Sequence, residues 1–170
     1  MLAYTFLIAA VAVERVAELV VSQRNLKWSK AHGGVEFGVS HYPFMVVLHT
    51  ALLVACLAEA AHRHFIPLLG WSMFVIVIAA QVLRWWCITT LGRQWNSRVV
   101  VVPGGGRVTG GPYRLFSHPN YVAVVVEGVA LPLVHTAWLT ALVFTVLNAA
   151  LLWVRITVEN TALRSLTAAP

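Results

Sequence analysis

Charged residues are scarce in this chain. Only 11% of the 170 residues are Asp, Glu, Lys or Arg, whereas 59% are hydrophobic and the mean hydropathy is +0.79. A soluble globular domain carries about 25% charged residues, so this composition excludes one. The chain is therefore predicted to be an all-α integral membrane protein, with residues 1–170 forming a single membrane-embedded domain.

Motifs typical of soluble sites are missing as well. The two cysteines, Cys56 and Cys87, lie in apolar stretches and outside any CxxC or Cys/His cluster, so neither a disulfide framework nor a metal site is expected. The glycines at 104–106 lack the phosphate-binding pattern, because Thr109 stands where GxGxxG requires its third glycine and no GK[ST] follows. These absences argue against a P-loop or Rossmann site.

The chain does contain several long apolar stretches. Five stretches are each about long enough to cross a hydrocarbon core of ~30 Å at ~1.5 Å per residue, although the fourth is the shortest. The first has no basic region before its apolar part, which favours a retained helix over a cleaved signal peptide. The sequence thus predicts about five transmembrane helices, at residues 2–21, 44–61, 71–91, 119–134 and 138–158.

Basic residues gather in alternate loops. By the positive-inside rule, this predicts a multi-pass protein with the N-terminus outside and the C-terminus in the cytoplasm. The net charge of +6 is explained by this bias and by attraction to anionic headgroups, so membrane lipids and no nucleic acid are expected as partners. The inner loops and tail contain Arg24, Lys27, Lys30, Arg93, Arg98, Arg107, Arg114 and Arg164, and the outer loops contain only Arg63.

Two polar loops separate the spans on the inner side. Residues 22–43 carry three glycines before Pro43 and are predicted to be irregular or to lie on the membrane surface. Residues 92–118 contain a β-prone RVVVV run, a PGGG turn and a GGPY turn. His118 and Pro119 are predicted to be the cap and first residue of the fourth span.

Several ionisable residues fall within the spans. An unpaired charge there costs at least ~2.5–3.5 kcal/mol, so these residues should be paired or line a wet cavity. Glu14 and Glu18 share a helical face that Gln81 and Arg84 could meet; a fold-specifying ion pair and a substrate site are both compatible with that arrangement. Glu127 should point into the bundle or into a cavity. The full set is Glu14, Arg15, Glu18, Glu59, Arg84 and Glu127.

The last span carries a polar stripe. At about 100° per residue, Asn148, Arg155 and Glu159 fall within roughly 40° of one another. Only a few residues around 135–137 join the last two spans, so these should form an antiparallel hairpin in which His118–Tyr121 meets Arg155–Glu159. The N-terminus of the fourth span could bind a carboxylate, and Glu159 could bind an ammonium group. These two helix ends would therefore suit an amino-acid-like ligand.

The motifs at these two helix ends resemble those of the isoprenylcysteine carboxyl methyltransferase family. That family shows GPYR…RHPxY entering one helix and RxxxEE ending the next. The resemblance covers residues 91–164 and includes two departures, because Ser117 replaces an arginine and Asn160 replaces the second glutamate. The matching segments here read GPYRLFSHPNY from Gly111 and RITVEN from Arg155.

The resemblance implies an S-adenosylmethionine-dependent methyltransferase of the compact bacterial type, in the plasma membrane, releasing S-adenosylhomocysteine. Its cofactor pocket would lie at the cytoplasmic face between the last two helices. Arg155 and Glu159 are implied as catalytic residues, with Arg155 orienting the acceptor oxygen. The residues implied in cofactor binding are Tyr113, which closes the pocket, His118, Pro119, Tyr121 and Glu159.

The methyl acceptor implied is lipophilic or lipidated. A lipid-like phenol or enol is the preferred acceptor, by similarity to members that methylate polyketide pyrones and resorcinols, and a prenylcysteine carboxylate is second. Phospholipid N-methylation or thiol S-methylation are alternatives within related membrane enzymes. A scaffold or transporter subunit whose buried charges only specify packing is the non-enzymatic alternative.

Overall fold

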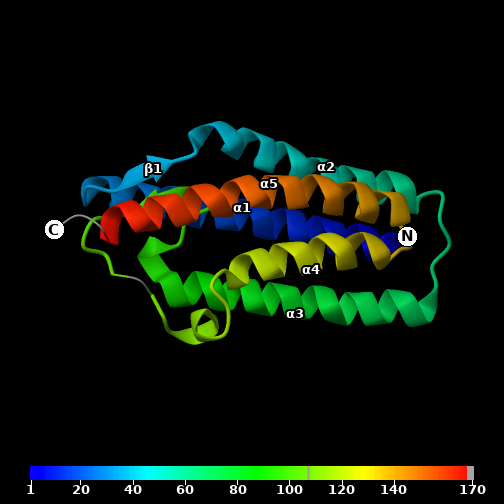
Figure 1. The fold of residues 1–170 in the computed structure, drawn as a ribbon. Helices are drawn as coiled ribbons and strands as arrows, with labels where there is room; N and C mark the ends of the chain where they lie inside the picture. Colours follow the sequence, from blue (N-terminus) through cyan, green and yellow to red (C-terminus); the bar gives the residue numbers. More distant parts are fainter. Residues whose placement is uncertain (107, 168–170) are drawn as a thin grey trace.

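A computed structural model describes residues 1–106 and 108–167, so Arg107, counted above among the inner-loop residues, lies outside the described residues. Five α-helices run along one axis (Figure 1). The N-terminus lies at one end of the bundle, and the C-terminal end of the last helix lies at the other, which we call the strand end because a small sheet lies there. The helices are α1 (Leu2–Ala31), α2 (Tyr42–Ala60), α3 (Pro67–Leu91), α4 (Pro119–Leu133) and α5 (Trp138–Thr167).

The helices match the five predicted spans in order. Three segments are long and apolar enough to cross a membrane, namely Val39–Ala60, Pro67–Gln94 and Trp138–Arg164. The α4 helix is apolar but only 15 residues long. Helix α1 has ample length, with three charged residues near its middle. The protein is therefore an all-α membrane protein, as its composition predicts.

The first polar loop is more ordered than predicted. Residues 22–31 continue α1 for almost three further turns, because no glycine or proline occurs before Gly33 and polar side chains dock on the loop after α3. Ser22 Oγ donates to Asn96 Oδ1 at 2.7 Å, and the Asn25 amide donates to the carbonyl oxygen of Trp95 at 2.7 Å. These long-range hydrogen bonds thus keep this polar segment helical.

A two-stranded antiparallel sheet joins the two polar loops. Strand β1 (Val35–Phe37) pairs with β2 (Val99–Val101), with Glu36 opposite Val100. The β-prone run therefore forms a strand, while its partner was predicted to be irregular. Gly38 ends β1 with φ 62°, and a Cβ there would lie 2.2 Å from the His41 ring, so the turn into α2 requires glycine.

The core lies between all five helices. It includes Tyr4 and Ile8 of α1, and both cysteines are fully buried and unpaired, consistent with small core residues. Gly128 lets α4 approach α5, since a Cβ there would lie 2.1 Å from the Phe144 ring.

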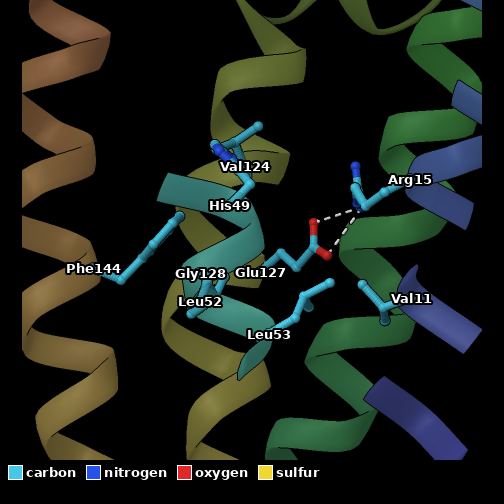
Figure 2. A pocket seen from close by; sticks show the side chains of 9 residues that line it. All are labelled: Val11, Arg15, His49, Leu52, Leu53, Val124, Glu127, Gly128 and Phe144. Atoms are coloured by element: carbon cyan, nitrogen blue, oxygen red, sulfur yellow. Dashed lines mark hydrogen bonds and ion pairs between the residues drawn. The ribbon is translucent and has the colours of Figure 1, made fainter. Parts of the chain in front are cut away.

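The buried charges form a network, as expected from the cost of leaving them unpaired. Arg15 of α1 lies 2.5 Å from Glu18 Oε2 and 3.0 Å from both carboxylate oxygens of Glu127 (Figure 2). Arg84 of α3 also pairs with Glu127, and Gln81 donates to it at 3.2 Å. Helices α1, α3 and α4 are thereby tied together at mid-bundle.

The other predicted intramembrane carboxylates also have partners. Glu14 accepts a hydrogen bond from Trp85 Nε1 at 2.5 Å. Glu59, at the end of α2, pairs with Arg63 at 2.9 Å and accepts the backbone N–H of Thr140 at 2.8 Å. Glu59 therefore satisfies the start of α5 as a helix cap from a neighbouring helix.

Candidate functional site

The start of α4 meets the second half of α5 at the strand end of the bundle. The Tyr121 hydroxyl donates to Glu159 and accepts from Arg155 Nε at 2.9 Å. His118 Nδ1 lies 3.5 Å from Glu159 Oε1, and its ring stacks on Tyr121 with centroids 5.3 Å apart. The structure thus brings together four of the residues that the sequence placed on these helix ends.

The turn before α4 is built from glycine and proline. Gly111 has φ 53°, and a Cβ there would lie 2.6 Å from Thr90 Oγ1, so the short 3-10 helix at Gly111–Arg114 packs closely on α3. Pro119 begins α4, where its missing N–H costs nothing. His118 occupies the cap position, but its side chain makes no capping hydrogen bond and lies beside Glu159 instead.

Part of the backbone N–H capacity at this helix start is already used within the helix. The N–H groups of Tyr121 and Val122 donate to the carbonyl oxygen of His118, at 3.1 and 3.4 Å. Pro119 has no N–H at all. Side chains, more than helix-end N–H groups, therefore supply the polar contacts at this end of α4.

Tyr113 lies beside this cluster. Its hydroxyl lies near the Cys87 thiol of α3, and Glu159 and Tyr121 are near enough to act on it electrostatically. Burial, with the neighbouring Cys87 thiol, raises the pKa of Tyr113 well above its usual range, so the phenol stays protonated.

Arg155 faces the interior of the bundle. It is 6% exposed, and Nη1 lies 2.8 Å from the Met45 sulfur of α2. Its guanidinium also lies over the Tyr121 ring, 5.5 Å from the centroid. The Tyr121 hydroxyl therefore stands between a buried cation and the half-buried Glu159 carboxylate.

A cavity of about 150 Å³ opens beside Arg155 and Tyr121. All five helices and the loop after α3 contribute to its walls, and Arg15, Glu18 and Arg84 of the charge network are among the lining residues. Asn120, the second residue of α4, also lines this cavity, and its Oδ1 is buried without a hydrogen-bond partner.

A smaller pocket of about 10 Å³ lies deeper in the bundle (Figure 2). It shares Arg15, His49, Leu53 and Val124 with the larger cavity. Figure 2 shows the Glu127 carboxylate pointing at Arg15. The charge network therefore borders both spaces.

Sequence reasoning missed the contribution of α2. Met45 and His49 line the cavity, but α2 was treated only as an apolar span. His49 offered a signal, because a histidine in the middle of an apolar span is costly unless it has a role in packing or a site. Met45 offered none.

The fold and the site together define an all-helical membrane protein with a polar, partly buried site at the end of its last helical hairpin. A model of the isoprenylcysteine carboxyl methyltransferase (ICMT) family matches residues 73–165, which include the whole His118–Glu159 cluster. The uncharacterized protein YpbQ of Bacillus subtilis (strain 168) is 36% identical over 162 residues, covering 95% of this chain and 96% of that protein. No solved structure matches the chain.

The chain belongs to the isoprenylcysteine carboxyl methyltransferase family. Membership supports a membrane methyltransferase, as the motifs at the two helix ends imply. The matched segment begins within α3, so α1 and α2, which supply Arg15, Glu18, Met45 and His49, lie outside it.

Proposed function

We propose that the protein transfers a methyl group from S-adenosylmethionine to an oxygen atom of a lipophilic acceptor that partitions into the membrane. The observation that carries this proposal is the linked set at the α4–α5 junction, in which Tyr121 bridges Arg155 and Glu159. An oxygen nucleophile needs a cation to stabilise its negative charge and a base to accept its proton. The buried cation and the carboxylate, linked through the hydroxyl, can supply both.

The residues of the junction suit the cofactor. The side chains of His118 and Glu159 are 20% and 29% exposed, so both are open to a ligand arriving from the strand end. Glu159 would hold an ammonium, His118 a carboxylate, and the rings of Tyr121 and Tyr113 would border the sulfonium, with Pro119 fixing the start of α4. When bound, S-adenosylmethionine supplies a methyl group that the acceptor oxygen takes as the carbon–sulfur bond breaks and its electron pair stays on sulfur.

The residues on the cavity side suit the acceptor. Arg155 would hold the reacting oxygen and stabilise its negative charge. The hydroxyl proton of the acceptor would pass through the Tyr121 hydroxyl to the Glu159 carboxylate, along the hydrogen bond that already joins them. A phenol or enol acceptor gains from this route, whereas a carboxylate is already ionised at pH 7.

The expected setting is the bacterial plasma membrane, with the N-terminus outside and the strand end in the cytoplasm. Basic residues at the strand end support this orientation, and Arg63 is on the opposite side. Soluble S-adenosylmethionine would then reach His118 and Glu159 from the cytoplasm, while the acceptor would enter from the bilayer.

Mass spectrometry of membrane lipids tests the proposal. Extracts from cells with and without the protein are compared for species heavier by one CH2, and the purified protein in detergent is tested for methyl transfer from labelled S-adenosylmethionine. A lipid methyl ether that depends on the protein supports the function. Unchanged lipids together with an absence of cofactor binding would reject it.

A further inference from the structure

The turn before α4 leaves two large apolar side chains uncovered. Leu115 is 72% exposed and Phe116 is 49% exposed, and Arg114 beside them is exposed as well. Figure 1 shows the connection between α3 and α4 at the strand end, on the outer side of α3. A single exposed apolar side chain needs no explanation, but two neighbours that adjoin an apolar helix face mark a contact surface.

The outward direction of these side chains is fixed by the backbone of the turn. Pro112 is fully buried, and the Tyr113 hydroxyl lies near the Cys87 thiol, so the inner side of the turn packs on α3. The N–H groups of Leu115 and Phe116 both donate to the Pro112 carbonyl oxygen, at 3.1 and 3.2 Å. Residues 112–113 therefore face the protein, and residues 114–116 face away from it.

The turn lies at the level where α3 leaves the membrane. A Cβ at Gly111 would lie 3.1 Å from Trp86 Nε1, so the turn is seated against that indole ring. Trp86 is 48% exposed and ends a row of exposed apolar residues on a segment that is long enough to span the bilayer. Tryptophan at the end of an apolar span is typical of the membrane–water interface. The other residues of the row are Val75, Ile78 and Val82.

The charge of the loop fits an anionic surface. Residues 92–118 contain four arginines and no Asp or Glu, and the Arg98 guanidinium lies 2.6 Å from Glu36 of β1. Arg114 stands directly beside the apolar pair, an arrangement that suits insertion at the boundary between acyl chains and anionic headgroups. A second copy joined through the same segment would instead bring two arginines together, so lipid is the better occupant.

We propose that residues 114–116 form an interfacial anchor, in which Leu115 and Phe116 insert below the headgroups and Arg114 binds the phosphate of an anionic lipid. The anchor lies between Tyr113 and His118 in the chain, so it holds the turn that carries both residues to the α4–α5 junction. The affinity of the junction for the cofactor then depends on anionic lipid. This consequence rests on the proposed function, whereas the anchor itself does not.

The depth of a nitroxide spin label tests the anchor. The label is attached to Phe116→Cys, in a chain without Cys56 and Cys87, in nanodiscs of phosphatidylcholine and phosphatidylglycerol. We expect it to collide more with oxygen, which partitions into the bilayer, than with a water-soluble nickel chelate. Val82→Cys on the lipid-facing side of α3 should behave alike, whereas Thr109→Cys, exposed in the same loop, should collide more with nickel.

Two results would overturn the anchor. Nickel collision at position 116 equal to that at position 109 would place the segment in water. Little collision with either reagent would show that protein, such as a second copy, covers the segment. Leu115→Cys repeats the measurement with Phe116 in place, so a result that depends only on losing the phenylalanine ring is recognised.

Calorimetry of S-adenosylhomocysteine in the same nanodiscs tests the consequence for the cofactor. This ligand has no net charge, so an anionic surface does not concentrate it. Without phosphatidylglycerol, we expect the wild-type affinity to fall about fivefold, equivalent to the ~1 kcal/mol of one basic residue at an anionic surface. Arg114→Gln should remove this lipid dependence. Arg24→Gln is the control, because Arg24 is exposed at the strand end on α1, and it should keep the dependence.

The two measurements separate the anchor from the proposed function. A lipid dependence that survives in Arg114→Gln, or that Arg24→Gln loses equally, would overturn the role of Arg114. Labels at bilayer depth with no S-adenosylhomocysteine binding in either lipid mixture would reject the proposed function and keep the anchor. Binding by the wild type with a label in water would keep the function and overturn the anchor.

Discussion

Replacing Tyr121 with phenylalanine removes one oxygen atom from the centre of the site. That oxygen accepts from Arg155 Nε at 2.9 Å and donates to Glu159, so the substitution breaks the link between the buried cation and the carboxylate. The ring that stacks on His118 is retained. The variant therefore separates the hydroxyl from the packing of the aromatic ring.

The expected loss is in turnover. A positioned proton-transfer group contributes roughly 10²–10⁴-fold, and a hydrogen bond to a charged group is worth about 1.5–3 kcal/mol. We expect kcat to fall about 100-fold, equivalent to ~2.7 kcal/mol, while the affinity for S-adenosylhomocysteine changes by less than about threefold.

Labelled methyl transfer to a synthetic alkylphenol in detergent gives kcat, and calorimetry gives the affinity for S-adenosylhomocysteine. Tyr4→Phe is the control, because it removes a buried tyrosine hydroxyl that donates to the Leu131 carbonyl at 3.0 Å, away from the site. It should lower stability by roughly 1 kcal/mol and leave kcat unchanged. Wild-type turnover by Tyr121→Phe would refute the proposed proton route, and a parallel fall in cofactor affinity would place Tyr121 in cofactor binding alone.

Three further outcomes are expected. Glu127→Gln leaves Arg15 and Arg84 short of a buried carboxylate, so thermal unfolding in detergent should show a loss of about 3–5 kcal/mol; an unchanged melting temperature would show that the network does not hold the helices together. Gly128→Ala places a methyl group against Phe144 and should cost about 1–3 kcal/mol in the same assay, and a neutral result would contradict the close α4–α5 contact. Thr109→Cys, in a chain without Cys56 and Cys87, should react with a membrane-impermeant thiol reagent only from the cytoplasmic side; labelling from outside would reverse the proposed orientation.

Much of the site could be predicted because it depends on short-range order. Asn148, Arg155 and Glu159 share a face through helical periodicity, and the short link before Trp138 makes α4 and α5 antiparallel neighbours. Those two facts suffice to bring Tyr121 to Glu159. Glu127 could be expected to be paired or to line a cavity, because an unpaired charge in an apolar span is costly, and it pairs with Arg15 and Arg84.

The remainder depends on long-range contacts that no local pattern encodes. Ser22 and Asn25 extend α1 by bonding to residues 92–97, and β1 becomes a strand only because β2 lies beside it. The cavity needs α2 at a particular rotation to present Met45 and His49. An apolar helix in a membrane has no amphipathic pattern that fixes this rotation, so the sequence alone did not predict it.

The most direct test of the central claim is calorimetry of S-adenosylhomocysteine with the purified wild-type protein and His118→Ala. With the cofactor site at the α4–α5 junction, we expect one binding site per chain and an affinity at least about tenfold weaker in His118→Ala. A tenfold change corresponds to the ~1.4 kcal/mol expected for a lost charge-assisted hydrogen bond. Equal affinity of the two proteins would mean that His118 only begins α4, and an absence of binding by the wild-type protein would contradict the assignment of the site.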